Sequence, residues 1–163
     1  MKRGTSMNSH DIQIVKLEPM RAASVYAFGR SPEGEAWKKL VAWAKPKGLL
    51  DSINEHPIFG FNNPNPISDN SKYGYELWIK VSSEIEPYRE VRIIEFRGGP
   101  YAVTRCEALG QPYMNIPATW QHLVDWCQIN NHKIGYHQSM EKFITAGDNP
   151  DNLVLDLYCP IQM

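Results

Sequence analysis

The chain has 163 residues, of which 42% are hydrophobic and 21% charged, and its formal net charge is −1. This balance is typical of a folded globular domain and excludes a disordered chain. The charge is near zero and no basic stripe stands out, which argues against direct binding of nucleic acid.

The N-terminal stretch and the cysteines indicate where the protein works. Residues 1–10 are polar and lack the apolar segment of a signal peptide, so we expect a loose tail there. No apolar run approaches the roughly 20 residues that span a bilayer. Cys106, Cys127 and Cys159 include no Cys-x-x-Cys pair, and the histidines show no metal-ligand spacing. We therefore expect a cytoplasmic protein with no membrane partner, metal or cofactor.

The first half of the chain predicts two strands, a helix and two more strands. Residues 31–33 form a helix start, with Ser31 as N-cap, Pro32 in the first turn and Glu33 near the positive end of the dipole. An apolar stripe at helical spacing follows, made of Trp37, Leu40, Val41 and Ala44. The strands are expected at residues 12–17, 22–28, 57–61 and 73–81.

The second half predicts the same series. Asn115 is the expected N-cap of a helix that has Pro117 in its first turn and runs to about Asn130. Its stripe comprises Trp120, Leu123, Val124 and Cys127. The expected strands are residues 90–96, 101–106, 141–145 and 153–161, with a hairpin turn at residues 98–100 between the first two.

Two segments of the chain recur. The sequence at residues 37–43 returns at residues 120–126 with both tryptophans, the leucine and the valine in register. Glu76-Leu77-Trp78 returns in similar form as Asp156-Leu157-Tyr158. Such internal similarity indicates a duplicated architecture.

The predicted fold class is therefore α+β, built from two β-β-α-β-β units with antiparallel sheet and one helix per repeat. A flexible tail at residues 1–10 precedes a single domain at residues 11–163, whose repeats span about residues 11–81 and 90–161. Each half is expected to be only marginally stable alone, so the halves are expected to share an interface. We expect a ligand groove at that interface, on the pseudo-twofold axis.

The repeated acid-x-aromatic pattern carries the candidate chemistry. Strand alternation places Glu76 with Trp78, and Asp156 with Tyr158, on the face away from the main apolar row. An acid beside an aromatic ring is complementary to a lipophilic cation, because the ring attracts positive charge and the carboxylate neutralises it. The alternative is an acid on a solvated sheet face. The repetition favours the pocket, since a solvated face gives no reason to keep the pattern twice.

The chain resembles the GyrI-like small-molecule-binding domain, an effector-binding module that occurs alone or fused to AraC-type and MerR-type regulators. The resemblance covers residues 11–161 and lies in the strand Tyr73–Val81, the ending Leu155–Ile161 and the duplicated helix. It implies a groove between two β-β-α-β-β copies, in which a buried glutamate contacts cationic drugs. The family also includes hydrolases that open electrophilic cyclopropane rings, which implies Glu76 as the general base on a water.

Three functions are compatible with this pattern. The first is a standalone domain that senses or sequesters hydrophobic, often cationic, small molecules. The second is a hydrolase of cyclopropane-containing toxic molecules, with Glu76 as the catalytic residue. The third is a protein-interaction module of the kind that restrains gyrase, as the family name implies. A binding protein without turnover is favoured over an enzyme.

The candidate ligand-binding residues combine the two acid-x-aromatic pairs with aromatic and apolar side chains that could form pocket walls or simply fill the core. They are Glu76, Trp78, Asp156, Tyr158, Tyr26, Phe61, Tyr101, Met114 and Trp120. The turn-rich segments at residues 62–64 and 110–115 are expected to rim the groove.

Overall fold

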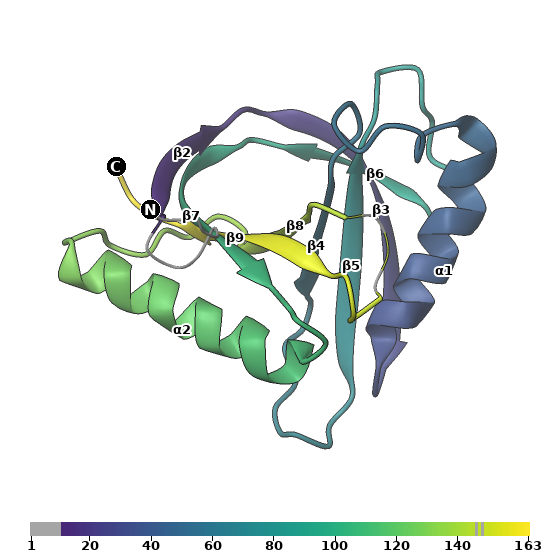
Figure 1. Ribbon diagram of the computed structural model, residues 1–163. Coiled ribbons are helices and arrows are strands. Elements are labelled where there is room, and N and C mark those ends of the chain that lie inside the picture. Colours follow the sequence, from purple (N-terminus) through teal and green to yellow (C-terminus); the bar gives the residue numbers. More distant parts are fainter. Residues whose placement is uncertain (1–10, 146, 148) are drawn as a thin grey trace. The chain divides into compact units, whose positions relative to one another are not determined.

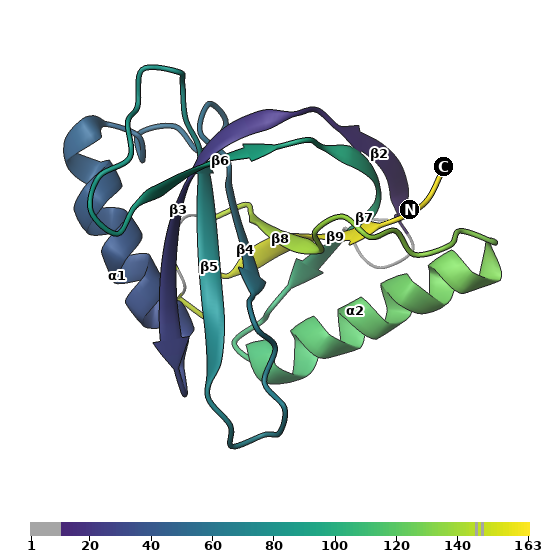
Figure 2. The same ribbon diagram turned by 180° about the vertical axis from the view of Figure 1, so that it is seen from behind.

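The computed structural model describes residues 11–145, 147 and 149–163. The tail expected at residues 1–10 lies outside the described residues. Figures 1 and 2 show how the helices and strands follow one another along the chain. In chain order the elements are β2 (Gln13–Leu17), β3 (Met20–Gly29), α1 (Pro32–Ala44), η1 (Lys45–Lys47), β4 (Ile58–Asn62), β5 (Tyr73–Lys80), β6 (Arg92–Phe96), β7 (Gly99–Glu107), α2 (Pro112–Ile129), β8 (Met140–Phe143) and β9 (Val154–Pro160). The predicted α+β fold with a duplicated β-β-α-β-β order is confirmed.

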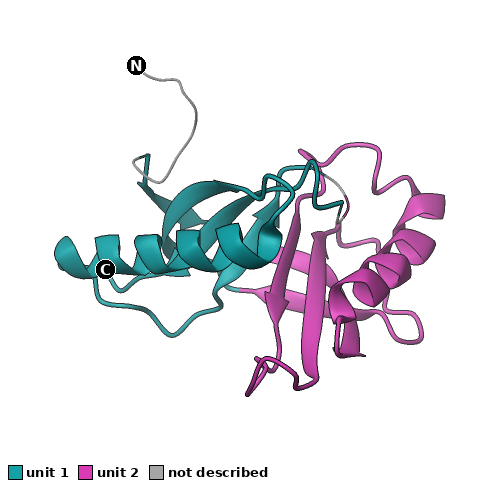
Figure 3. Ribbon diagram, turned by 60° about the horizontal axis from the view of Figure 1, so that its bottom comes forward, with its two compact units in different colours: residues 1–19, 97–145, 149–163 teal, residues 20–96, 146–148 magenta. Residues whose placement is uncertain are grey.

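The chain divides into two compact units that do not coincide with the two halves of the sequence. One unit comprises residues 20–96. The other comprises strand β2 together with residues 97–145 and 149–163 (Figure 3). Each unit therefore takes its outermost strand from the opposite repeat: β2 pairs with β7, and β6 pairs with β3.

The unit formed by residues 20–96 contains an antiparallel sheet in the order β4-β5-β3-β6. Helix α1 packs against β3 and β5. The core of this unit comes from alternate strand residues, among which Leu77 and Ile79 of β5 are fully buried. Glu76 and Trp78 alternate with them and so point to the other face of the sheet.

Helix α1 begins as predicted, with Pro32 at the first helical position and Glu33 and Glu35 in the first turn. Its buried stripe differs from the prediction, because Ala36 and Trp43 are also buried and Val41 is 38% exposed. The buried set is Ala36, Trp37, Leu40, Trp43 and Ala44. Because 3.6 residues make one turn, positions 36, 40, 43 and 44 face one side and position 41 lies at its margin.

The other unit contains an antiparallel sheet in the order β2-β7-β9-β8, and α2 packs against β7 and β9. Leu123 and Cys127 are the buried residues of α2, whereas Trp120 and Val124 are half-buried. The second helical stripe is thus narrower than the sequence predicts.

Two local predictions are wrong. Helix α2 begins at Pro112, with Gln111 as N-cap, so Asn115 is not the cap and Pro117 lies inside the helix. Proline is favoured at the first helical position, and Pro112 takes this position instead of Pro117. The hairpin expected at residues 98–100 is also absent, since β6 pairs with β3 while β7 pairs with β2 and β9. The chain passes there from one unit to the other.

Candidate ligand-binding site

Glu76 lies in the middle of β5, flanked by strands on both sides. Tyr26 of β3 and Phe61 of β4 stand opposite Glu76 in the strand register. Ser24 of β3 is opposite Trp78. Residues directly opposite each other share a face of the sheet, so these five side chains point to one side. The alternation predicted for β5 is therefore the feature that places the acid among aromatic residues.

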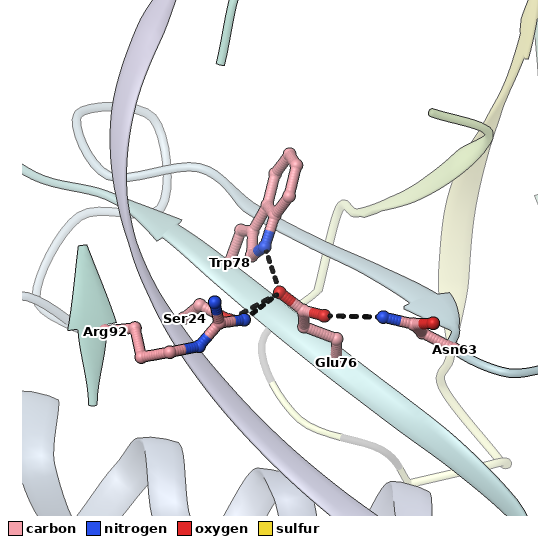
Figure 4. A network of polar contacts seen from close by, with 5 residues as sticks. All are labelled: Ser24, Asn63, Glu76, Trp78 and Arg92. Atoms are coloured by element: carbon pink, nitrogen blue, oxygen red, sulfur yellow. Dashed lines mark hydrogen bonds and ion pairs between the residues drawn. The ribbon is translucent and has the colours of Figure 1, made fainter. Parts of the chain in front are cut away.

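The Glu76 carboxylate is buried, with the residue only 3% exposed, and it accepts hydrogen bonds from four side chains (Figure 4). Oε2 receives the Ser24 hydroxyl at 2.6 Å and the Trp78 indole N–H at 2.7 Å. Arg92 donates to the same oxygen at 3.3 Å, and Asn63 donates to Oε1 at 3.2 Å. A buried carboxylate needs such donors, because it would otherwise lose its hydration without compensation.

Aromatic rings pack against Trp78, whose indole N–H contacts this carboxylate. Phe61 meets Trp78 edge-on at a centroid distance of 5.0 Å, and Phe96 lies tilted against Trp78 at 5.4 Å. Phe61 and Trp78 are buried, while the Tyr26 ring is 37% exposed. We call Glu76, Trp78, Phe61, Phe96 and Tyr26 the acid–aromatic cluster. It combines one desolvated negative charge with ring faces and edges, the combination that binds apolar cations.

Arg92 differs from the other donors to Glu76. Its side chain is 61% exposed, whereas the side chain of Glu76 is 4% exposed. It makes one contact of 3.3 Å, longer than the bonds from Ser24 and Trp78. An ion pair of this kind is held weakly, since the exposed partner keeps most of its hydration.

The corresponding acid of the second repeat is held more firmly. Arg105 of β7 stands opposite Asp156 of β9 and donates two hydrogen bonds to it, at 2.9 Å and 3.3 Å. The hydrogen bond to Asp156 raises the pKa of the Arg105 guanidinium. A two-pronged arginine–carboxylate pair fixes both side chains. The Asp156 carboxylate is thus bound through both oxygens by an arginine of the neighbouring strand.

Tyr158 and Tyr101 form an aromatic pair in the same unit as Asp156, with centroids 5.4 Å apart. The Tyr101 hydroxyl donates to the backbone carbonyl of Gln138 at 2.6 Å, and the residue is fully buried. Burial raises the pKa of the Tyr158 phenol, and the charge of Asp156 adds to this shift. Both tyrosines are therefore neutral, buried wall or core residues.

The remaining candidates lie on α2. Trp120 is half-buried and its indole N–H donates to Glu141 at 3.2 Å. Met114 is 67% exposed near the start of the helix. Of the nine candidates, Tyr26, Phe61, Glu76 and Trp78 belong to the unit of residues 20–96, and the other five belong to the second unit.

Three residues of the site escaped the sequence prediction: Ser24, Arg92 and Phe96. Asn63 lies in the segment predicted to rim a groove, so the sequence carried a signal for it. Ser24 and Arg92 stand opposite each other on β3 and β6, a pairing between repeats that no local pattern indicates.

Among the described residues, no three His, Cys, Asp or Glu side chains lie close enough to hold a metal ion. In the same part of the chain, no helix has the length and apolar character needed to cross a membrane. Cys106, Cys127 and Cys159 are free and buried.

A profile of the GyrI-like small molecule binding domain matches residues 10–162. The chain belongs to this family. No curated protein sequence matches it. The C-terminal domain of EcmrR shares the fold, with a TM-score of 0.68 at 9% identity over 93% of this chain and 97% of that one. A GyrI-like domain binds small molecules, and this is the general function of the chain.

Two further structures have the same fold. A hydrolase from Listeria innocua has a TM-score of 0.67 at 12% identity, over 93% of this chain and 91% of that one. SAV2435 bound to tetraphenylphosphonium has a TM-score of 0.54 at 12% identity, over 93% of this chain and 94% of that one. At these identities the likeness establishes the fold alone.

Proposed function

We propose that this GyrI-like domain binds hydrophobic cations at the acid–aromatic cluster, and thereby senses or sequesters them. The observation that carries the proposal is the buried Glu76 carboxylate, which sits beside Trp78 and opposite Phe61 and Tyr26. Glu76 supplies the negative charge and the rings supply apolar area.

The energetic basis is the low polarity around the carboxylate. A cation that approaches Glu76 in place of water interacts with it more strongly than in bulk solvent. The rings add about 0.5–2 kcal/mol per favourable cation–π contact. Both terms require a ligand that is apolar as well as charged, because a strongly hydrated cation would lose too much solvation on entering.

The comparisons support the same class of ligand. SAV2435 shares the fold and is described as bound to tetraphenylphosphonium, an apolar cation with four aromatic rings. This compound suits the acid–aromatic cluster by charge and by aromatic surface, and it is a convenient probe.

The proposal is tested by titrating the wild-type protein and Glu76→Gln with tetraphenylphosphonium and following tryptophan fluorescence. We expect saturable binding that weakens about tenfold in the variant, equivalent to about 1.4 kcal/mol. Glu95→Gln is the matched control, because Glu95 is an exposed acid of β6 whose charge is removed in the same way. Absence of saturable binding, or equal affinity in Glu76→Gln, would contradict the proposal.

A second candidate function is hydrolysis of an electrophilic, cyclopropane-containing ligand. Two observations favour it. Oε1 of Glu76 accepts one hydrogen bond from the described residues, from Asn63, so it retains capacity to accept a proton from water. The phenol of Tyr26 stands opposite Glu76 and could donate to the opening ring. The fold also occurs in a hydrolase from Listeria innocua.

In this reaction a water oxygen forms a bond to one ring carbon and gives its proton to Glu76, while the ring C–C bond breaks and leaves its electron pair on the other carbon of that bond, which takes a proton. Multiple turnovers of such a ligand, lost in Glu76→Gln and reduced in Tyr26→Phe, would establish the enzyme. Binding without turnover would leave the domain as a binding protein.

A further inference from the structure

We infer that Arg92 occupies the place at Glu76 that the cation of a ligand takes, and that Arg92 thereby sets the charge preference of the site. The inference rests on the proposed function and names a specificity-determining residue for it. Neither the family profile nor the acid-x-aromatic pattern points to this arginine, because it comes from the first strand of the second repeat.

The hydrogen bonds at Glu76 divide into a fixed part and an exchangeable part. Ser24 is 1% exposed and Trp78 is 7% exposed, and both donate short bonds to Oε2 as neutral groups. They orient the carboxylate without neutralising its charge. Among the described residues, Arg92 is the cationic side chain that contacts Glu76. Its guanidinium nitrogen lies 3.3 Å from Oε2, which already accepts hydrogen bonds from two other donors.

Arg92 is also placed so that it can leave. It belongs to β6, which is the outer strand of the β4-β5-β3-β6 sheet, and its side chain is 61% exposed. Moving the guanidinium fully into water therefore requires little change in its surroundings. Glu76 would keep the bonds from Ser24, Trp78 and Asn63 while a ligand cation replaces Arg92.

The second repeat provides an internal comparison. Asp156 is held by two bonds from Arg105, whose side chain is 31% exposed, half the exposure of Arg92. Exchange at Asp156 would break a two-pronged pair and leave Arg105 partly buried without its partner. The two repeated acids therefore differ. A ligand cation can replace Arg92 at Glu76, whereas Arg105 stays bound to Asp156.

If Arg92 competes with the ligand, its removal must have opposite effects on ligands of opposite charge. Tetraphenylphosphonium and tetraphenylborate have nearly the same shape and carry one positive and one negative charge. In Arg92→Met the carboxylate loses its internal cation, so it attracts the phosphonium more strongly and repels the borate more strongly. Methionine keeps an unbranched apolar chain at the position.

The experiment measures the affinity of both ions for the wild type, Arg92→Met, Arg89→Gln and Glu76→Gln by calorimetric titration. We expect Arg92→Met to bind tetraphenylphosphonium about threefold to tenfold more tightly than the wild type, and tetraphenylborate more weakly. Arg89→Gln is the matched control, since Arg89 is an exposed cation of the same unit that lies over Tyr88. Arg89→Gln should change the affinity for neither ion. Because it removes the same charge as Arg92→Met, it separates local competition at Glu76 from an effect of net charge.

The outcomes distinguish this inference from the proposed function. Equal or weaker phosphonium binding by Arg92→Met, with binding still weakened in Glu76→Gln, would overturn the role of Arg92 and leave the proposed function intact. Equal gains in Arg92→Met and Arg89→Gln would also overturn it. Failure of the wild type and of Arg92→Met to bind the phosphonium would overturn both.

Discussion

The indole N–H of Trp78 donates a 2.7 Å hydrogen bond to the carboxylate of Glu76, which lies two residues earlier on the same strand. Strand geometry puts residues two apart on one face, so a single local pattern builds both the charge and the ring beside it. Trp78 therefore orients the acid and, with Phe61 and Phe96, forms its apolar surroundings.

Replacing Trp78 by phenylalanine should lower the free energy of unfolding by more than the loss of ring volume alone. A hydrogen bond to a charged group contributes about 1.5–3 kcal/mol. Trp43→Phe is the control, because the Trp43 N–H is buried and has no hydrogen-bond partner among the described residues. Urea denaturation should show the larger loss for Trp78→Phe. Equal losses in the two variants would contradict the importance of this hydrogen bond.

Gly74→Ala should destabilise the fold. A Cβ at this position would collide with the Asn63 carbonyl oxygen and the Tyr26 hydroxyl. Overpacking of this kind costs about 1–3 kcal/mol. Gly29→Ala, also on a strand of the same sheet, meets nothing within 4 Å and should change stability by less than about 0.5 kcal/mol. Thermal unfolding of the two variants measures the difference, and similar melting temperatures would refute it.

Asp156→Asn should affect stability and leave ligand binding unchanged. The substitution removes the charge that holds Arg105, at a cost of about 1–3 kcal/mol for a partly buried pair. Because Arg105 already satisfies Asp156, we expect no change in the affinity for tetraphenylphosphonium. Weakened phosphonium binding by a folded Asp156→Asn protein would show that Asp156 contacts the ligand after all.

Stability should fall at alkaline pH because of the buried thiols. Burial, with a smaller contribution from Cys127, raises the pKa of the Cys159 thiol from 9.0 to about 12. The unfolded chain therefore releases this proton at lower pH than the folded protein does. The stabilisation is complete below about pH 9 and is lost as pH rises toward 12.

Urea unfolding under reducing conditions, from about pH 8 to about pH 11, checks this expectation. The decline should be shallower in Cys159→Ala. Burial also raises the pKa values of Cys106, Cys127 and Tyr158, so the variant should retain part of the decline. A free energy of unfolding that stays constant or increases over this range would contradict the assignment.

Local and repeated patterns were sufficient to predict much of the fold. The recurrence of two tryptophans with a leucine and a valine indicated the duplication, and strand alternation placed Glu76 beside Trp78 on one face. Each feature can be recognised from short stretches of sequence, without knowledge of strand pairing. Helix α1 was likewise predictable, since Pro32 and the early acids mark its first turn.

The partners of Glu76 depend on long-range pairing and were not predictable from a single sequence. Arg92 reaches Glu76 because β6 pairs with β3 instead of forming a hairpin with β7. Ser24 contributes because its strand lies between β5 and β6. The ion pair at Asp156 also depends on long-range strand pairing, because Arg105 comes from the neighbouring strand β7. The ligand groove between the repeats stays a prediction.

A structure of the wild-type protein with tetraphenylphosphonium tests the central claim most directly. Our account predicts that the phosphonium lies beside the Glu76 carboxylate and against the ring of Trp78, with Arg92 moved out of contact with Glu76. Phosphonium bound elsewhere, with the bond between Arg92 and Glu76 unchanged, would contradict it.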